Sequence, residues 1–350
     1  MVGAEPGGTM VMDTLRRSIS KMRLGVAGAG MIVAFLLVLG IVESQSAQAQ
    51  TLTNLYNFTG GADGGEPHAA LVRDSQGNVY GTTYIGGLSN CRQTGCGTVF
   101  KVDPSGTETV LYSFCPGGYP CSDGATPLAD LVRDSAGNLY GATVGGGSYP
   151  YGGVIFKVDK AGKETVVYSF CSAQKCTDGR YPEAGVIFDS TGNLYGTTFY
   201  GGAYDHGTVF KLSPNSQGGW TETVLYNFGN RPYDGKFPQA DLVFDKKGNL
   251  YGTTIDGGHG YGTVFRLTKS KTGWLETILV AFNGGQDGST PYGGLVFDAQ
   301  GNLYGTTELG GNTHYPCNDQ CGTVFKLTPV HGTWRRKVIH RPSNRTSRTG

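Results

Sequence analysis

The sequence predicts an all-β fold, a β-propeller of five four-stranded blades. A phrase of the form D-x-x-G-N-[LV]-Y-G-[TA]-T occurs five times, with its first glycine at positions 77, 137, 192, 248 and 301. The intervals of 53 to 60 residues are typical of propellers, solenoids and repeat arrays. Glycine makes up 59 of 350 residues, and its regular placement indicates a turn-rich β protein.

Each repeat contains four strand-like segments rich in β-branched and aromatic residues, which in the first repeat are residues 70–74, 78–83, 97–102 and 108–114. We expect the first, apolar segment to be innermost, because the strand beside a propeller channel is buried on both faces. A parallel β-solenoid is the alternative. The Gly-Asn turns reverse the chain at once, so they favour hairpins and a propeller.

The repeated phrase is expected to form the hairpin turn between the first two segments. Asp74 accepts backbone N–H bonds, Gly77 takes a positive φ, and Asn78 tolerates the strained exit. The equivalent residues are Asp134, Gly137 and Asn138; Asp189, Gly192 and Asn193; Asp245, Gly248 and Asn249; and Asp298, Gly301 and Asn302. Calcium ligation or catalysis is the alternative, but a catalytic site is needed only once, so five copies favour a structural role.

One strand-like segment is left over after the five sets of four. Residues 51–58 and 333–340 both match the fourth-segment pattern. Arg335, Arg336 and Lys337 replace Glu-Thr-Val in the C-terminal copy, so we expect residues 51–58 to complete the fifth blade and close the ring. The alternative is a shortened form of a longer propeller.

The two ends of the chain differ in character from the repeats. Residues 1–49 predict a signal peptide, with a basic stretch, an apolar run at 24–42 and a small-residue cleavage motif. An uncleaved membrane anchor at 24–42 is the alternative. We expect the propeller at 50–340, a basic disordered tail at 341–350, and export to the cell surface or the medium. The formal net charge of +1 argues against a nucleic-acid-binding protein.

Loop lengths separate the two faces of the predicted propeller. Because strand direction alternates, the loops between second and third segments share one face with the links between blades. The former vary from three to ten residues, whereas the D-x-x-G-N turns on the opposite face keep one length. Variable loops on a rigid scaffold carry binding, so we expect function on the variable face.

The eight cysteines all fall on this variable face. They predict four local disulfides: Cys91–Cys96, Cys115–Cys121, Cys171–Cys176 and Cys317–Cys321. An even number of cysteines behind a signal peptide favours disulfides, which would stiffen the longest loops. Zinc is the alternative, disfavoured because no pair has the two-residue spacing of a zinc knuckle. We expect no metal and no cofactor.

Two residue sets on the variable face are candidates for ligand binding. A D-G-x-x-P motif before each innermost strand is expected to place five aspartates round the channel mouth, as a cation or polar-ligand site or merely as turns: Asp63, Asp123, Asp178, Asp234 and Asp287. Loop residues that could stack on sugars or contact a protein are Tyr149, Tyr151, Tyr204, His206, His259, Tyr261, His314 and Tyr315. The sequence contains no recognisable Ser-His-Asp or Cys-His arrangement and no phosphate loop.

The unit GNLYGTT…GG…GTVFKL resembles the Gloeo/Verruco tandem repeat family of bacterial exported proteins. The resemblance covers residues 51–330 and all five copies of the phrase. It implies an exported, propeller-like protein, and the family supplies no catalytic residues to transfer.

Two classes of function stay open. The first is a non-catalytic recognition or scaffold module, a monomer that binds a glycan or protein. The second is a secreted hydrolase or lyase that acts on polysaccharide with a carboxylate pair and a loop histidine. The regular repeats favour the first, because catalysis needs one asymmetric constellation. Glu66, His68 and Glu183 occur in single units near the predicted channel mouth and favour the second.

Overall fold

The computed structural model of the chain describes residues 53–88, 91, 94–149, 151–311 and 321–342. The predicted signal peptide, the apolar run at 24–42, His314, Tyr315 and Cys317 lie outside these residues. The chain divides into two compact units, 1–53 and 54–350, and the second contains the whole described fold. Among the described residues, no helix is long and apolar enough to cross a membrane.

The second unit is all-β and propeller-like, with five four-stranded antiparallel sheets that follow one another along the chain. The sheets are β1 (Val72–Arg73), β2 (Val79–Thr83), β3 (Thr98–Val102) and β4 (Glu108–Ser113); β5 (Val132–Arg133), β6 (Leu139–Thr143), β7 (Val154–Val158) and β8 (Glu164–Ser169); β9 (Ile187–Phe188), β10 (Leu194–Thr198), β11 (Thr208–Pro214) and β12 (Trp220–Asn227); β14 (Val243–Phe244), β15 (Leu250–Thr254), β17 (Thr263–Ser270) and β18 (Gly273–Ala281); and β19 (Val296–Phe297), β20 (Leu303–Thr307), β21 (Thr323–Val330) and β22 (Thr333–His340). A two-stranded ribbon, β13 (Gly235–Lys236) with β16 (Asp256–Gly257), and two 3₁₀ turns, η1 (Gln174–Cys176) and η2 (Gly285–Asp287), lie in the loops.

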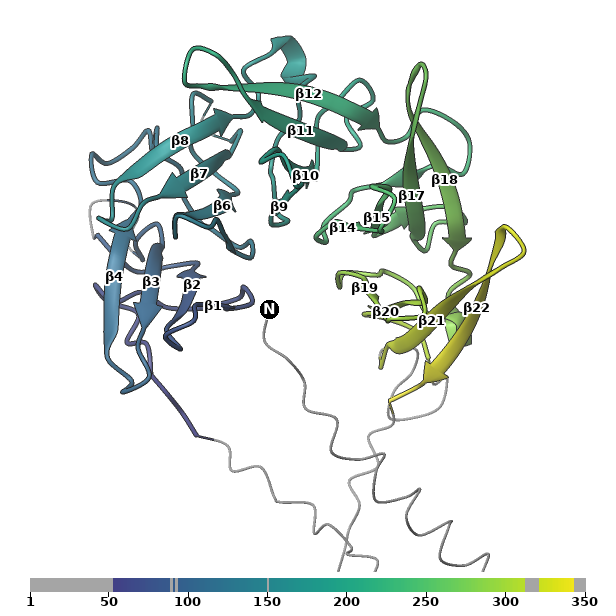
Figure 1. Ribbon diagram of the computed structural model, residues 1–350, viewed down its shortest axis with the longest axis horizontal. Helices are drawn as coiled ribbons and strands as arrows, with labels where there is room; N and C mark the ends of the chain where they lie inside the picture. The colour runs from purple at the N-terminus through teal and green to yellow at the C-terminus, as the bar shows by residue number, and fades with distance from the viewer. Residues whose placement is uncertain (1–52, 89–90, 92–93, 150, 312–320, 343–350) are drawn as a thin grey trace, which may run out of the picture. The chain divides into compact units, whose positions relative to one another are not determined.

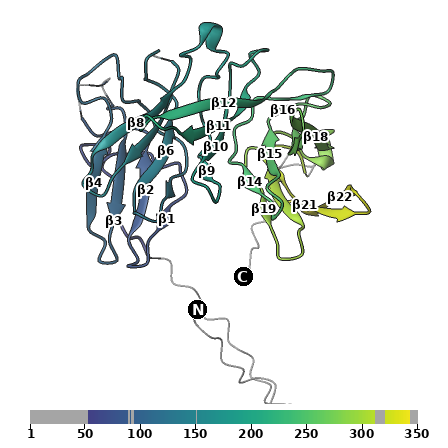
Figure 2. The same cartoon turned by 45° about the horizontal axis from the view of Figure 1, so that its top comes forward.

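The short first strand of each sheet is innermost, as the sequence predicts. Figure 1 shows β1, β9, β14 and β19 directed toward the middle of the unit, with β4, β8, β12, β18 and β22 on its outside. Figure 2 shows the same order within the third sheet, from β12 through β11 and β10 to β9.

The repeated phrase forms a hairpin turn, and both oxygens of its carboxylate accept hydrogen bonds. Asp74 Oδ1 accepts the backbone N–H groups of Gln76 at 2.9 Å and Asn78 at 3.0 Å. Asp74 Oδ2 accepts the Asn78 side-chain amide at 2.8 Å and the Tyr80 hydroxyl at 3.0 Å. Gly77 has φ +90°, as expected, but Asn78 is not among the positive-φ residues. Asn78 therefore serves as a hydrogen-bond donor and not as a strained exit.

The glycine of the repeated Tyr-Gly-Thr leaves room for a phenylalanine on the next strand. Gly196 pairs with Phe210, and a Cβ built on Gly196 would lie 2.6 Å from the Phe210 ring. The other four sheets repeat this contact at Gly81, Gly141, Gly252 and Gly305. Packing thus explains a glycine that needs no positive φ.

Gly196→Ala is therefore expected to destabilise the protein by about 1–3 kcal/mol through overpacking. The measurement is the denaturation midpoint of the variant against that of the wild type. Gly117→Ala is the matched control, because a Cβ on Gly117 meets nothing within 4 Å. Equal effects from the two substitutions would contradict the packing explanation.

Phenylalanine pairs join neighbouring sheets. In the first four sheets, the phenylalanine directly after the fourth strand meets the phenylalanine of the next sheet's third strand edge-on: Phe114 with Phe156, Phe170 with Phe210, Phe228 with Phe265, and Phe282 with Phe325. The ring centroids are 4.9 to 5.3 Å apart, and all eight side chains are buried. Four hydrophobic clusters of described residues join the sheets in sequence, from first to second through fourth to fifth.

The fourth strand of the fifth sheet is β22, which corrects the expectation that residues 51–58 complete this sheet. The basic residues of β22 do not prevent pairing because exposure alternates along the strand. Arg335 and Lys337 face solvent, while the partly buried Arg336 forms an ion pair with Asp287. Phe58 instead packs against Phe100 of the first sheet at 4.8 Å, as Phe114 packs against the second.

Candidate functional site

The loop face of the protein, formed by the loops between second and third strands and the links between sheets, carries a set of exposed tyrosines. Seven described tyrosines have more than two-fifths of their surface exposed, and all lie on this face. They are Tyr119, Tyr149, Tyr151, Tyr204, Tyr233, Tyr261 and Tyr292. The tyrosines of the opposite, turn face are held against turn carboxylates, as Tyr80 is by Asp74.

Four of the predicted loop tyrosines are exposed, and one predicted histidine is not. Tyr149 and Tyr151 are 47% and 53% exposed, and their rings lie 6.3 Å apart in one loop. The exposed His259 lies 5.8 Å from the ring of Tyr233 in the neighbouring link. His206 is half-buried against Phe237 at 5.3 Å, so its ring faces the protein interior.

Four aspartates of the D-G-x-x-P motif lie between the outer strands of neighbouring sheets, and Asp63 takes the equivalent place beside residues 56–59; all five accept hydrogen bonds. Asp123 accepts the Tyr112 hydroxyl at 2.8 Å and the Cys115 backbone N–H at 2.8 Å. Asp234 accepts the Tyr226 hydroxyl and the Asn230 N–H at 3.0 Å. Because these tyrosines belong to outermost strands, the aspartates do not surround the channel mouth. Their ligand-binding role stays a prediction, and the turn role has direct hydrogen-bond support.

Each of these aspartates lies near one charged residue of the fourth strand in the following sheet. In the first four sheets this residue is a glutamate: Glu108, Glu164, Glu222 and Glu276. One buried oxygen of each glutamate has no hydrogen-bond partner, nor has Oδ1 of Asp178, which is only 4% exposed. Burial first, and then the negative charge of Asp178, raises the pKa of Glu222 to about 7.

Positive charge enters two of the five equivalent positions. Arg231, from the link before the fourth sheet, forms an ion pair with Glu276, whose side chain is 1% exposed. In the fifth sheet Arg336 replaces the glutamate and pairs with Asp287. No ion pair among the described residues involves Glu164 or Glu222, so burial and the negative charge of the facing aspartate raise the pKa of each carboxyl group without a cation to offset them.

A second pair of carboxylates meets at the inner strands. Asp130 precedes the second sheet and Asp241 the fourth, at a position occupied by alanine or glycine in the other three repeats. Burial first, and then charge repulsion from Asp130, raises the pKa of Asp241 to about 6. Asp130 also accepts the backbone N–H of Ala70, and Asp241 that of Gly185. These bonds join the starts of inner strands from adjacent sheets.

Of the three single-unit residues noted in the sequence, Glu66 and His68 contact each other and Glu183 has a different partner. Glu183 accepts the side-chain amide of Gln239 at 2.5 Å, and burial raises its pKa. Glu66 and His68 approach each other at 3.8 Å in the first sheet's link, both more than half exposed. Among the described residues, no observed contact assembles the three into one catalytic set.

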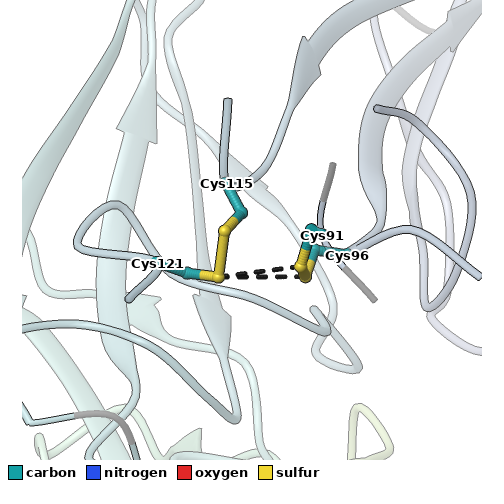
Figure 3. Close-up of side chains that lie close together, drawn as sticks. All are labelled: Cys91, Cys96, Cys115 and Cys121. Atoms are coloured by element: carbon teal, nitrogen blue, oxygen red, sulfur yellow. Dashed lines mark hydrogen bonds between the residues drawn. A yellow bond between two sulfur atoms is a disulfide. The ribbon is translucent and has the colours of Figure 1, made fainter. Parts of the chain in front are cut away.

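Two pairs of cysteines meet on the loop face. The disulfides Cys91–Cys96, Cys115–Cys121 and Cys171–Cys176 are confirmed, while the fourth predicted pair includes Cys317, outside the described residues. Figure 3 shows the first two disulfides side by side, with Cys121 Sγ 3.6 Å from Cys91 Sγ and 3.9 Å from Cys96 Sγ. Because all four side chains are buried, the cluster belongs to the interior of the loop layer.

Grooves occur on the turn face between neighbouring sheets. One of about 610 Å³ lies between the fourth and fifth sheets and includes Tyr251, Phe297 and Trp334. One of about 480 Å³ lies at the equivalent position between the second and third sheets and includes Tyr140, Phe188 and Trp220. Their aromatic rings are partly used in packing, since Trp334 contacts Tyr251 at 5.9 Å and Trp220 contacts Tyr140 at 6.3 Å.

Comparison with known protein families identifies the repeat. A model of the Gloeobacter/Verrucomicrobia repeat matches residues 38–183 and 171–347. The chain belongs to this family. No curated protein matches it.

Solved structures with a similar fold share little sequence with this Gloeobacter/Verrucomicrobia repeat protein. A protein described as a gluconolactonase is 17% identical, with a TM-score of 0.42 over 67% of this chain and 69% of its own. A luciferin-regenerating enzyme is 14% identical, with a TM-score of 0.42 over 77% and 92%. An endo-arabinase from Bacteroides thetaiotaomicron is 12% identical, with a TM-score of 0.38 over 78% and 93%. These likenesses are too distant to carry a functional argument.

The sequence analysis did not predict two groups of buried charged residues in this Gloeobacter/Verrucomicrobia repeat protein. Asp130 and Asp241 were detectable, because they are unit-specific departures at a fixed repeat position. The glutamates of the fourth strands, Glu108, Glu164, Glu222 and Glu276, were not detectable, because Glu-Thr-Val is typical of an ordinary strand start. Their importance comes from an aspartate 41 to 45 residues earlier, which only the tertiary fold brings close.

Proposed function

We propose that the chain is an exported, non-catalytic recognition module, a monomeric five-bladed propeller that binds a glycan or protein through its loop face. The observation that carries the proposal is the segregation of every largely exposed described tyrosine to that face. Tyrosine offers a flat apolar ring with a hydroxyl, which suits stacking on sugars and burial in protein interfaces. It also loses little conformational entropy when bound.

The disulfides support this role. They close the Cys91–Cys96 loop and the Cys115–Cys121 and Cys171–Cys176 links, all on the tyrosine-bearing face. Tyr119 lies within one of these closed links and is 74% exposed. A loop that is stiff before binding loses less freedom when it binds, which favours affinity.

The alternative function is that of a polysaccharide hydrolase or lyase, and the pair Asp130 and Asp241 is the observation that favours it. Both side chains are nevertheless engaged with backbone N–H groups of neighbouring inner strands. A hydrogen bond to Asp130 is among the causes that raise the pKa of Asp241. Glycosidases hold their two carboxyl groups about 5 Å or more apart to admit the sugar or a water. The inner pair therefore fits a structural tie better than an acid and a nucleophile.

Residues 50–350, tested against soluble polysaccharides and cell-envelope fractions, are expected to bind at least one of them without releasing product. Binding is read as a rise in melting temperature and by isothermal calorimetry, and product by reducing-end and unsaturated-sugar assays. Released product that disappears in Asp241→Asn would overturn the non-catalytic proposal.

Tyr149→Ala combined with Tyr151→Ala is expected to weaken that binding about tenfold or more, the usual effect of removing an aromatic anchor. The melting temperature of the free variant should stay unchanged, because both rings are exposed. Trp334→Ala, in the turn-face groove, is the comparison variant. Binding lost in Trp334→Ala and kept in the tyrosine variant would place recognition on the turn face.

A further inference from the structure

The cysteine cluster on the loop face has the arrangement of a four-sulfur metal site. The sulfurs of Cys91, Cys96, Cys115 and Cys121 all lie within 4.8 Å of one another. Each of the four side chains is at most 6% exposed. Two sulfurs come from the loop between β2 and β3, and two from the link between β4 and β5, so the cluster joins separate segments (Figure 3).

Two of the separations between the pairs match those of a tetrahedral zinc site. A zinc–thiolate bond of about 2.3 Å places the sulfurs of a tetrahedron roughly 3.8 Å apart. The two cross-pair contacts, from Cys121 Sγ to Cys91 Sγ and Cys96 Sγ, are 3.6 and 3.9 Å. Folding therefore already places Cys121 Sγ at this spacing from both sulfurs of the other loop.

We propose that Cys91, Cys96, Cys115 and Cys121 form a tetrathiolate zinc site when reduced and two disulfides when oxidised. The change needs a thiol reductant: two equivalents of a dithiol transfer four electrons and four protons, break the two S–S bonds and become disulfides themselves. One Zn²⁺ then binds the four sulfurs and displaces four thiol protons to solvent. The oxidised state closes each segment on itself, whereas the zinc state ties the first sheet's loop to the link that follows it.

The repeat arrangement explains why the site occurs at one place among the described residues. A loop and the link after it are neighbours in each sheet, as shown by the hydrogen bonds from Phe114 N to Gly97 O and from Phe170 N to Gly153 O. In the first sheet both segments carry a cysteine pair. After the second sheet only the link does, with Cys171 and Cys176, and the loop before it contains no cysteine.

The test uses residues 50–350 reduced with dithiothreitol without oxygen, incubated with ZnCl₂ and desalted. Zinc is measured by plasma emission spectrometry, and free thiols by alkylation and intact mass. We expect one zinc per chain, and protection from alkylation of the four cluster cysteines alone. Cobalt(II) in place of zinc should give the absorption of a tetrahedral tetrathiolate complex.

Two double variants make the test specific. Cys171→Ser with Cys176→Ser should keep the full zinc equivalent, whereas Cys115→Ser with Cys121→Ser should lose it. Circular dichroism of each reduced sample establishes that the β fold is present. The proposal would be overturned if the reduced, folded wild type bound no zinc, or if both variants bound equal amounts. It would also be overturned if reduction unfolded the chain and added zinc did not restore the fold.

Discussion

The free energy of unfolding is expected to fall as the pH rises from about 5 to about 8, because the folded state binds protons on the buried Glu164 and Glu222 more tightly than the unfolded state does. Burial raises the pKa of Glu164 and Glu222 to about 7, against 4.5 for an ordinary glutamate. Between these two values the folded state holds more protons than the unfolded state. The stabilisation is therefore complete below about pH 4.5 and is lost as the pH rises through 7.

The expected loss is about 1 kcal/mol for each of these glutamates, after allowance for the part of each side chain that solvent screens. The measurement is urea denaturation at both pH values and constant ionic strength. Glu164→Gln with Glu222→Gln should reduce the pH dependence and raise stability at the higher pH. Glu66→Gln is the control, since the Glu66 side chain is 55% exposed and should change neither. An unchanged pH slope in the double variant would contradict the assignment.

The fifth sheet indicates how this position can be stabilised by an ion pair and without a protonated glutamate. There Arg336 stands where the glutamate stands elsewhere, and it pairs with Asp287. Glu222→Arg should place a guanidinium near Asp178 in the same way. We expect this variant to lose the third sheet's share of the pH dependence, which the pH-resolved denaturation experiment would detect as a smaller slope. An increased slope would mean that the two sheets are not equivalent.

The turn aspartates act in the opposite sense at low pH. Hydrogen bonds from Asn78, and then from Tyr80, lower the pKa of Asp74 to about 2. Stability from this group is present above the ordinary value of 3.8 and is lost as the pH falls through the lower value. Together with the glutamates, it sets an expected stability maximum between about pH 4 and 5.

Local chemistry was readable from the sequence wherever the interacting groups are few residues apart. The Asp74 turn is made by donors within six residues, and the confirmed disulfides close loops of five or six. The four-stranded units, the innermost first strand and the exposed loop tyrosines follow from the same short-range pattern of strands, turns and variable loops.

Contacts between repeats were not readable, because they depend on how neighbouring sheets pack. Cys91 and Cys121 are 30 residues apart, and Arg336 and Asp287 are 49 apart. The error over β22 has this origin: without the facing sheet, its basic residues look unsuited to a strand. His206 was misplaced for a similar reason, since Phe237 covers it from the next link.

Phe228→Ala is expected to destabilise the protein by about 3–5 kcal/mol, because it removes a fully buried ring that joins the third and fourth sheets. The matched control is Phe58→Ala. Phe58 meets Phe100 in the same edge-on geometry, at 4.8 Å against 5.1 Å, but it is only partly buried. Phe58→Ala should therefore cost clearly less, measured as the difference in denaturation midpoint at a constant slope.

The comparison also tests ring closure. Each later sheet packs against the complete sheet that precedes it in the chain. Among the described residues, the first sheet has only residues 54–58 on the corresponding side. A closed ring would bury Phe58 between that segment's own sheet and the first, as Phe228 is buried between the third and fourth. Equal losses from Phe58→Ala and Phe228→Ala would thus mean that the fifth sheet packs behind residues 54–58. A small loss from Phe58→Ala would mean that this edge of the first sheet faces solvent, and that the terminal segment covers the core without joining the ends.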